Sequence, residues 1–200
     1  RNKAVGGMSI ALGNYAQAMK ASSMAIGTAT LSSGFNSLAM MRQSAATADF
    51  ATAIGTTAWA DGKGSFAMGY SATAKGDQSI AIGAAETKKV ASGYNTPSAK
   101  YNADGNTVTE GARSLAFGTK ARTSVAATDS MAFGSNSTTS GANAVAVGNS
   151  ANAAANDAFA FGNTAQATGA NAIAMGRTAE AKQLNAIALG GQAKALEANA

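Results

Sequence analysis

The sequence predicts an all-β solenoid made of 14-residue coils, each with two short strands. The first observation is a repeat, because NAIAMG at 171–176 returns as NAIALG at 185–190 and as DAFAFG at 157–162. The second is that large apolar residues alternate with small ones inside the repeat, which is the period of a β-strand. The third is a second alternating pattern in the other half of each repeat. A fixed period of this kind indicates one supersecondary unit stacked on the next.

The repeat is aligned on its closing glycine, which we number position 0. Twelve copies end at Gly13, Gly27, Met41, Gly55, Gly69, Gly83, Gly118, Gly134, Gly148, Gly162, Gly176 and Gly190. The step is 14 residues, except for 35 after Gly83 and 16 after Gly118. We therefore expect a single domain over residues 1–200. Both ends fall inside a repeat, so we expect the chain to be an excerpt of a longer protein.

The first strand of each copy covers positions −4 to −1. Position −2 is alanine in all twelve copies, and position −4 is Ser or Ala. Positions −3 and −1 carry large apolar residues, with Thr52 as the single exception. This strand should have one small face and one bulky face. We expect Thr52, and Met41 in the glycine column, to distort two adjoining coils locally.

The second strand covers positions +2 to +5. Its positions +3 and +5 are small in nearly every copy, whereas +2 and +4 are mostly polar. A second glycine column lies seven residues before the first, and glycines mark turns. Asn or Asp recurs at position −5, as at Asn143 and Asn171, and such side chains hydrogen-bond neighbouring backbone in turns. The pattern predicts a stacked asparagine ladder.

If the small faces of both strands meet inside the coil, only Ala, Ser and Gly fit between such closely spaced sheets. The bulky residues then point outward and stack at roughly 4.8 Å per coil. Each is worth roughly 1.5–3 kcal/mol when buried, and soluble monomers do not expose apolar surface on this scale. The stripe is therefore expected to be the interface of a cyclic homo-oligomer. Its representatives are Ile10, Leu12, Ile80, Ile82, Phe159, Phe161, Ile173, Met175, Ile187 and Leu189.

The step of 35 residues predicts a loop insertion at 84–104, with strand two resuming at 106–109. Thr107 and Thr109 fall in the small columns, whereas Glu86 and Lys88 do not. The alternative is a loop that starts after Lys88. Asp104 and Gly105 form a turn signal that could close a small hairpin.

Basic and aromatic residues concentrate in the insertion. We expect receptor binding there by Lys88, Lys89, Tyr94, Lys100 and Tyr101. Residues 88–122 hold six basic and two acidic residues, hence +4 of the total +5, and would form a basic collar that attracts an acidic partner. The alternative is a solvated loop whose lysines serve solubility.

Trp59 is the single tryptophan and falls on the polar face of strand two. Exposed tryptophan is favoured at interface hot spots, so Trp59 is a further receptor-binding candidate. Alternatively, it covers a gap beside Tyr15, Leu31 or Tyr70.

Several function classes find no support. Neither cysteine nor histidine is present, so thiolate metal sites and a histidine-dependent solenoid acyltransferase are excluded. The ten carboxylates form no paired column for acid–base chemistry, and the calcium-binding nonapeptide is absent. An ice-binding surface would need an outward array of matched threonines, but positions +2 and +4 carry mixed residue types. Nucleic-acid binding would rest on the basic collar alone, without a recognisable binding module. We expect no catalytic residue, no metal, no cofactor and no nucleic-acid partner.

Three stretches carry a family resemblance: NAVAVGNSANA at 143–153, NAIAMGRTAEA at 171–181 and SIAIG at 79–83. They resemble the head domain of YadA-like trimeric autotransporter adhesins. The resemblance implies a left-handed parallel β-roll, with three chains around one axis and the apolar stripe as trimer interface. It implies display on a Gram-negative outer membrane through a stalk and anchor outside this chain.

The same resemblance implies binding to host matrix proteins or cell-surface receptors, a role in virulence and, in some members, autoaggregation. Multivalent attachment would follow from three copies per fibre. The alternative is that the segment is a structural spacer and that another part of the fibre binds.

Overall fold

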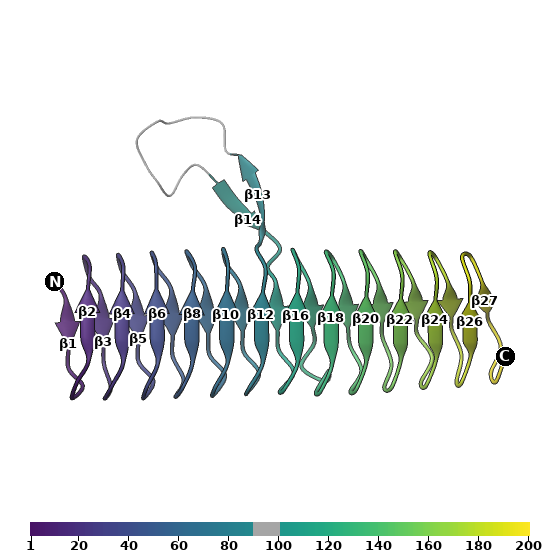
Figure 1. Ribbon diagram of the computed structural model, residues 1–200, viewed down its shortest axis with the longest axis horizontal. Helices are drawn as coiled ribbons and strands as arrows, with labels where there is room; N and C mark the ends of the chain where they lie inside the picture. Colours follow the sequence, from purple (N-terminus) through teal and green to yellow (C-terminus); the bar gives the residue numbers. More distant parts are fainter. Residues whose placement is uncertain (90–100) are drawn as a thin grey trace.

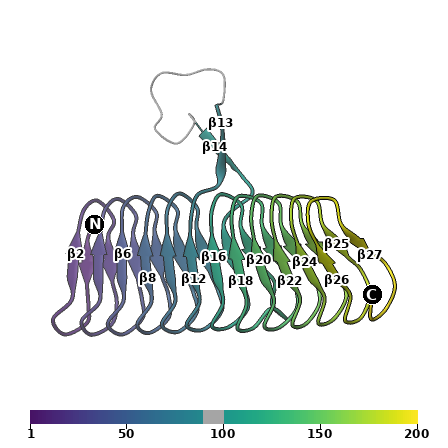
Figure 2. The same cartoon turned by 45° about the vertical axis from the view of Figure 1, so that its right-hand side comes forward.

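The computed structural model describes the backbone of residues 1–89 and 101–200, and the side chains of 1–86 and 105–200. Within these residues all regular structure is β, and all of it except one antiparallel hairpin is arranged as a parallel solenoid of about twelve turns (Figure 1). Successive coils stack along one axis, and each coil runs through strand, turn, strand and turn (Figure 2). The predicted all-β parallel solenoid is confirmed.

Two parallel sheets run the length of the rod. The first sheet has 12 strands: β2 (Ile10–Leu12), β4 (Met24–Ile26), β6 (Leu38–Met40), β8 (Thr52–Ile54), β10 (Phe66–Met68), β12 (Ile80–Ile82), β16 (Leu115–Phe117), β18 (Met131–Phe133), β20 (Val145–Val147), β22 (Phe159–Phe161), β24 (Ile173–Met175) and β26 (Ile187–Leu189). The second sheet has 13 strands: β1 (Lys3–Ala4), β3 (Gln17–Ala18), β5 (Leu31–Ser32), β7 (Ala45–Ala46), β9 (Trp59–Ala60), β11 (Thr73–Ala74), β15 (Val108–Thr109), β17 (Arg122–Thr123), β19 (Thr138–Thr139), β21 (Asn152–Ala153), β23 (Gln166–Ala167), β25 (Glu180–Ala181) and β27 (Lys194–Ala195).

Each strand pairs with the equivalent strand of the coils before and after it. Phe159, for example, lies opposite Val145 on one side and Ile173 on the other. The register therefore follows the 14-residue period. Thr52 keeps this register, and so does β6, which directly precedes Met41. Neither exception in the sequence pattern disturbs strand pairing.

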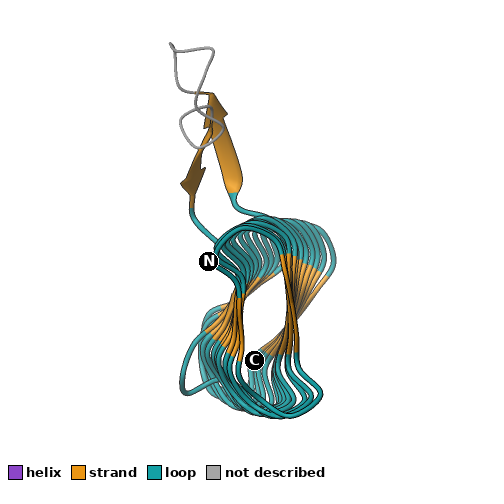
Figure 3. Ribbon diagram, turned by 90° about the vertical axis from the view of Figure 1, so that its left-hand side faces the viewer, coloured by secondary structure: helices purple, strands orange, loops and turns teal. Residues whose placement is uncertain are grey.

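The two sheets face each other across each coil (Figure 3), and the core between them is built from small residues. In the C-terminal coils it is a continuous alanine cluster running from Ala144 to Ala195. Around the centre of the rod, hydroxyl pairs cross the core, with Ser114 and Thr123 2.8 Å apart and Ser130 and Thr139 3.0 Å apart. These pairs satisfy polar groups that would otherwise be buried without a partner.

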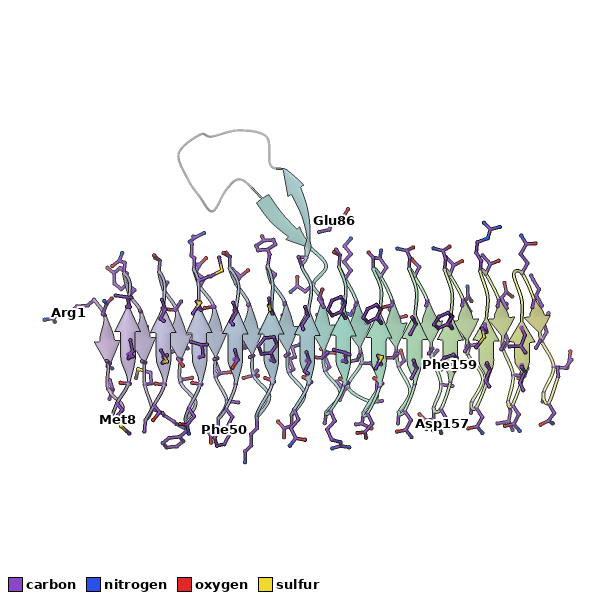
Figure 4. The ribbon with its side chains drawn as sticks, viewed as in Figure 1. Arg1, Met8, Phe50, Glu86, Asp157 and Phe159 are labelled. Atoms are coloured by element: carbon purple, nitrogen blue, oxygen red, sulfur yellow. The ribbon has the colours of Figure 1, made fainter. Side chains whose placement is uncertain are left out.

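Two turns close each coil and form the two long edges of the rod. We call positions 0 to +2 the insertion edge, because the insertion leaves the roll there, and positions −6 and −5 the asparagine edge. The chain departs two residues later than the predicted start at 84, since Ala85 is buried and its amide donates to the Tyr70 carbonyl oxygen of the preceding coil at 2.9 Å. Met8, Phe50 and Asp157 mark the asparagine edge in Figure 4, and Glu86 marks the opposite side. The apolar stripe on the first sheet lies between these two edges.

The asparagine edge is a ladder, as predicted. Asn143 Nδ2 donates to Asp157 Oδ1 at 3.0 Å, and Asn171 Nδ2 donates to Asn185 Oδ1 at 3.2 Å. The non-glycine residues at position −5 all have a positive φ, from 51° to 60°. Asn and Asp tolerate this left-handed conformation better than most residues, which explains their recurrence.

Candidate interaction surfaces

The apolar stripe lies on the outer face of the first sheet along the whole rod. All of its residues are exposed or half-buried in the single chain, whereas the alanines between them are buried along almost the whole rod. Leu12 is 63% exposed and Phe161 is 47% exposed. Phe159 lies on the face of the sheet, away from both edges (Figure 4).

Rings of neighbouring coils stack along the stripe. Phe117 and Phe133 lie in adjacent strands β16 and β18, with centroids 4.9 Å apart and planes 7° from parallel. Such stacking makes a flat, bulky surface. Its chemistry suits a second apolar surface, and the hydroxyl of Thr52 is its single polar side-chain group.

The insertion contains a hairpin that stands out from the rod. β13 (Glu86–Lys89) pairs antiparallel with β14 (Tyr101–Asp104), and Glu86 lies opposite Asp104 at the end nearest the roll (Figures 1 and 3). The prediction that Asp104 and Gly105 close a hairpin is wrong, since they lie at its base. They return the chain to the roll, where strand two resumes in β15.

The predicted receptor-binding residues of the insertion distribute over this hairpin. Lys88 and Lys89 lie in β13, and Tyr101 lies in β14, with Lys89 opposite Tyr101 in the backbone register. Tyr94 and Lys100 lie outside the described residues. The hairpin thus places Lys88, Lys89 and Tyr101 away from the roll surface (Figure 2).

The return of the chain is anchored in the roll. Thr107 is fully buried, and its hydroxyl donates to the carbonyl oxygen of Gly118 at 2.6 Å. Thr109 is also buried, and its hydroxyl lies 2.9 Å from that of Ser79. These contacts hold the base of the hairpin in a fixed place on the insertion edge.

The expected basic collar is not gathered at one place. Arg113 lies on the asparagine edge, the edge away from the hairpin, where its guanidinium binds the Asp129 carboxylate with two hydrogen bonds of 2.6 and 2.7 Å. These hydrogen bonds lower the pKa of Asp129 and raise the pKa of Arg113. Lys120 pairs with Glu86 at the base of the hairpin. Sequence proximity had grouped charges that the coil separates.

Trp59 stands on the outer face of the second sheet and is 45% exposed. Its neighbours in the adjacent strands are Ala45 and Thr73, both smaller than the indole. The indole Nε1 donates to Thr47 Oγ1 at 3.4 Å, which orients the ring. The ring is therefore available to a partner on a surface separate from both the stripe and the hairpin.

Both edges carry exposed apolar residues that the sequence analysis did not select. On the asparagine edge, Met8 is 87% exposed, Phe50 56% and Phe35 45%. On the insertion edge, Tyr15 is 60% exposed and Met41 50%. The signal was present in the sequence, because Met8 and Phe50 are the two apolar residues in a column otherwise filled by polar residues and glycine, and Met41 interrupts the glycine column.

The part of the chain that the structure describes holds no cluster of three or more His, Cys, Asp or Glu side chains that would form a metal site. Among the same residues, no helix is long and apolar enough to cross a membrane.

The fold and its surfaces define a class: a parallel β-solenoid of two-strand coils with an alanine core and an outward apolar stripe. The family profile described as YadA head domain repeat (2 copies) matches residues 4–30, 32–58, 46–71, 60–85, 126–151, 140–165, 153–179 and 181–200. These matches cover more than half of the chain, which therefore belongs to this family. The longest unmatched range, 86–125, contains the hairpin.

A solved structure has a similar fold. The crystal structure of the collagen-binding domain of the Yersinia adhesin YadA aligns with a TM-score of 0.53 and 21% identity, over 80% of this chain and 69% of that chain. No curated protein sequence matches the chain significantly. Family membership and fold confirm the resemblance seen in the sequence.

Proposed function

We propose that this domain is the head of a bacterial surface adhesin that assembles as a homotrimer and attaches to host matrix proteins or cell-surface receptors without catalysis. The observation that carries the proposal is the continuous apolar stripe, which half-buried and exposed large residues form along the rod. A similar solved structure is described as the collagen-binding domain of an adhesin, which supports matrix attachment.

Assembly follows from the energetics of the stripe. Burying each large side chain contributes roughly 1.5–3 kcal/mol, so a chain that exposes such a stripe is far from its free-energy minimum in water. Three copies around an axis parallel to the rod bury Ile10, Leu12, Ile80, Ile82, Phe159, Phe161, Ile173, Met175, Ile187 and Leu189 together. Family membership favours three subunits over other cyclic numbers.

Attachment would be multivalent and would take place at the cell surface of a Gram-negative bacterium. Three heads per fibre convert weak single contacts into strong avidity when the geometry lets them engage together. The anchor in the outer membrane would lie in parts of the protein beyond these residues. Autoaggregation between cells is a second use of the same surfaces.

The hairpin is our first candidate for receptor contact and Trp59 our second. The hairpin stands away from the roll, and its range is the longest that the family profile leaves unmatched. Deleting residues 84–104 joins Gly83 to Gly105 and restores the 14-residue step, so the roll should survive. The matched variant Trp59→Thr places on β9 the residue that already occupies the same position in β11.

The experiment measures binding of intact protein and both variants to immobilised collagen, fibronectin, laminin and host cells, with light scattering as a control for assembly. Binding lost only on deletion assigns the receptor contact to the hairpin. Binding lost only in Trp59→Thr assigns it to the second sheet. If the intact trimer binds none of these, the segment is a spacer, and if the chain is monomeric at micromolar concentration the assembly proposal is wrong.

A further inference from the structure

The exposed apolar residues of the two edges occur at matching heights along the rod. Met8 and Tyr15 belong to the same coil, at positions −5 and +2 around Gly13. Phe35 and Met41 belong to the coil that Met41 itself closes. In each coil one residue of the pair lies on the asparagine edge and the other on the insertion edge.

Three of these residues occupy backbone positions that disfavour them. Met8 and Tyr15 have φ of 56° and 58°, and Met41 has φ of 83° where all of the glycines in its column have φ between 112° and 154°. A left-handed conformation costs a non-glycine residue on the order of 1–2 kcal/mol. In a single chain these side chains gain little in return, because at least half of each remains exposed.

Phe35 is held in place by its surroundings. The Lys20 ammonium lies 4.6 Å from the centre of the Phe35 ring, and the Asp49 carboxylate accepts the Phe35 amide hydrogen bond at 2.9 Å. Lys20 and Asp49 also form an ion pair at 3.7 Å. The ring is thus preorganised on the edge, which lowers the entropy lost when a partner covers it.

A second copy of this chain fits these observations. When three first sheets face one axis, they form a triangle in cross-section, and the asparagine edge of each protomer meets the insertion edge of the next at a corner. Rotation about the rod axis leaves heights unchanged. Phe35 of one protomer therefore meets Met41 of its neighbour, and Met8 meets Tyr15.

We infer that these two edge pairs set the vertical register of neighbouring protomers, an inference that rests on the proposed trimer. The stripe alone specifies register weakly, because its coils are near copies and a slip of one coil, about 4.8 Å, brings similar residues back into contact. A slip of one coil separates both pairs and, of their four residues, brings only Met41 against another exposed apolar residue of the asparagine edge, Phe50.

Oxidative cross-linking tests this inference in the whole 200-residue chain, which contains no native cysteine. Phe35→Cys with Met41→Cys should yield a covalent trimer on a non-reducing gel, since the two positions lie on opposite edges of one chain. The control joins Phe35→Cys with Tyr15→Cys, two coils apart and thus about 10 Å in height, beyond the roughly 7 Å Cα separation that a disulfide spans. It should stay monomeric on the same gel.

A second matched pair, Met8→Cys with Tyr15→Cys, repeats the test if the first variant does not fold. Light scattering on the reduced proteins separates the two proposals. A trimer in which neither matched pair cross-links, or in which the control links equally well, overturns the register inference and leaves the proposed assembly intact. A monomer overturns both.

Discussion

Replacing Gly148 by alanine should damage the stacking of two adjacent coils. Gly148 has φ of 134°, and a Cβ atom built on it would lie 2.4 Å from the carbonyl oxygen of Gly162 and 2.7 Å from its carbonyl carbon. Both contacts are with backbone of the next coil, which cannot rotate away as a side chain could. The glycine column is thus required by close approach as well as by conformation.

Gly190 supplies a matched control. It has φ of 112°, in the same disfavoured region, yet no heavy atom other than those of its two chain neighbours lies within 4 Å of its Cβ position in this chain. Strain at a left-handed alanine costs roughly 1–3 kcal/mol in both variants. Forcing the coils apart at Gly148 adds roughly 1–3 kcal/mol, as other cases of overpacking do. We therefore expect Gly148→Ala to be the less stable variant by that second amount.

The assay is urea unfolding of both variants and the parent, with circular dichroism as readout at one protein concentration and with assembly checked by light scattering. Met41 indicates how the column can relax, because it lowers φ to 83° and the strands beside it stay paired. If Gly148→Ala and Gly190→Ala lower the free energy of unfolding by the same amount within about 0.5 kcal/mol, the close approach between coils does not explain why glycine occupies this column.

Three further predictions follow from single contacts. Phe161→Asp should convert the proposed trimer to monomer in light scattering, because burying an unpaired carboxylate in the stripe costs roughly 3–5 kcal/mol per protomer, and an unchanged mass would contradict the proposed interface. Ser65→Ala should raise the free energy of unfolding by about 1 kcal/mol, since the buried Ser65 hydroxyl has no hydrogen-bond partner. Ser114→Ala should lower the free energy of unfolding by about 1 kcal/mol, since it removes the hydrogen bond to Thr123; equal effects of the two variants would show that these hydrogen bonds do not decide stability. The lowered pKa of Asp129 means that its pair with Arg113 stabilises the fold above the ordinary carboxyl pKa of about 3.9, and this stabilisation disappears as the pH falls through the pKa of Asp129 in the folded protein. Asp129→Asn should weaken this dependence of the free energy of unfolding on pH, and an identical dependence in both proteins would show that the pair contributes nothing.

The repeat determined most of the fold before any tertiary information. Each residue of a solenoid contacts the equivalent residue of the next coil, so the 14-residue period encodes the stacking directly. Alternation of large and small residues assigned the core and the outward stripe, and the Asn column predicted the ladder that Asn143 and Asp157 form. The left-handed turns explain why Asn and Asp were selected there.

The surfaces depended on information that the period does not carry. Asp104 and Gly105 read as the turn of a hairpin, yet they lie at its base, because antiparallel pairing within the insertion has no repeated neighbour to define it. Arg113 was grouped with the lysines of the insertion, although half a coil of chain places it on the opposite edge beside Asp129. Distance along the sequence reports height in this fold, whereas the side of the rod depends on the position of a residue within the coil. Phe35 and Met41 are seen to lie at matching heights on opposite edges only when both the height along the rod and the side of the rod are known for each residue.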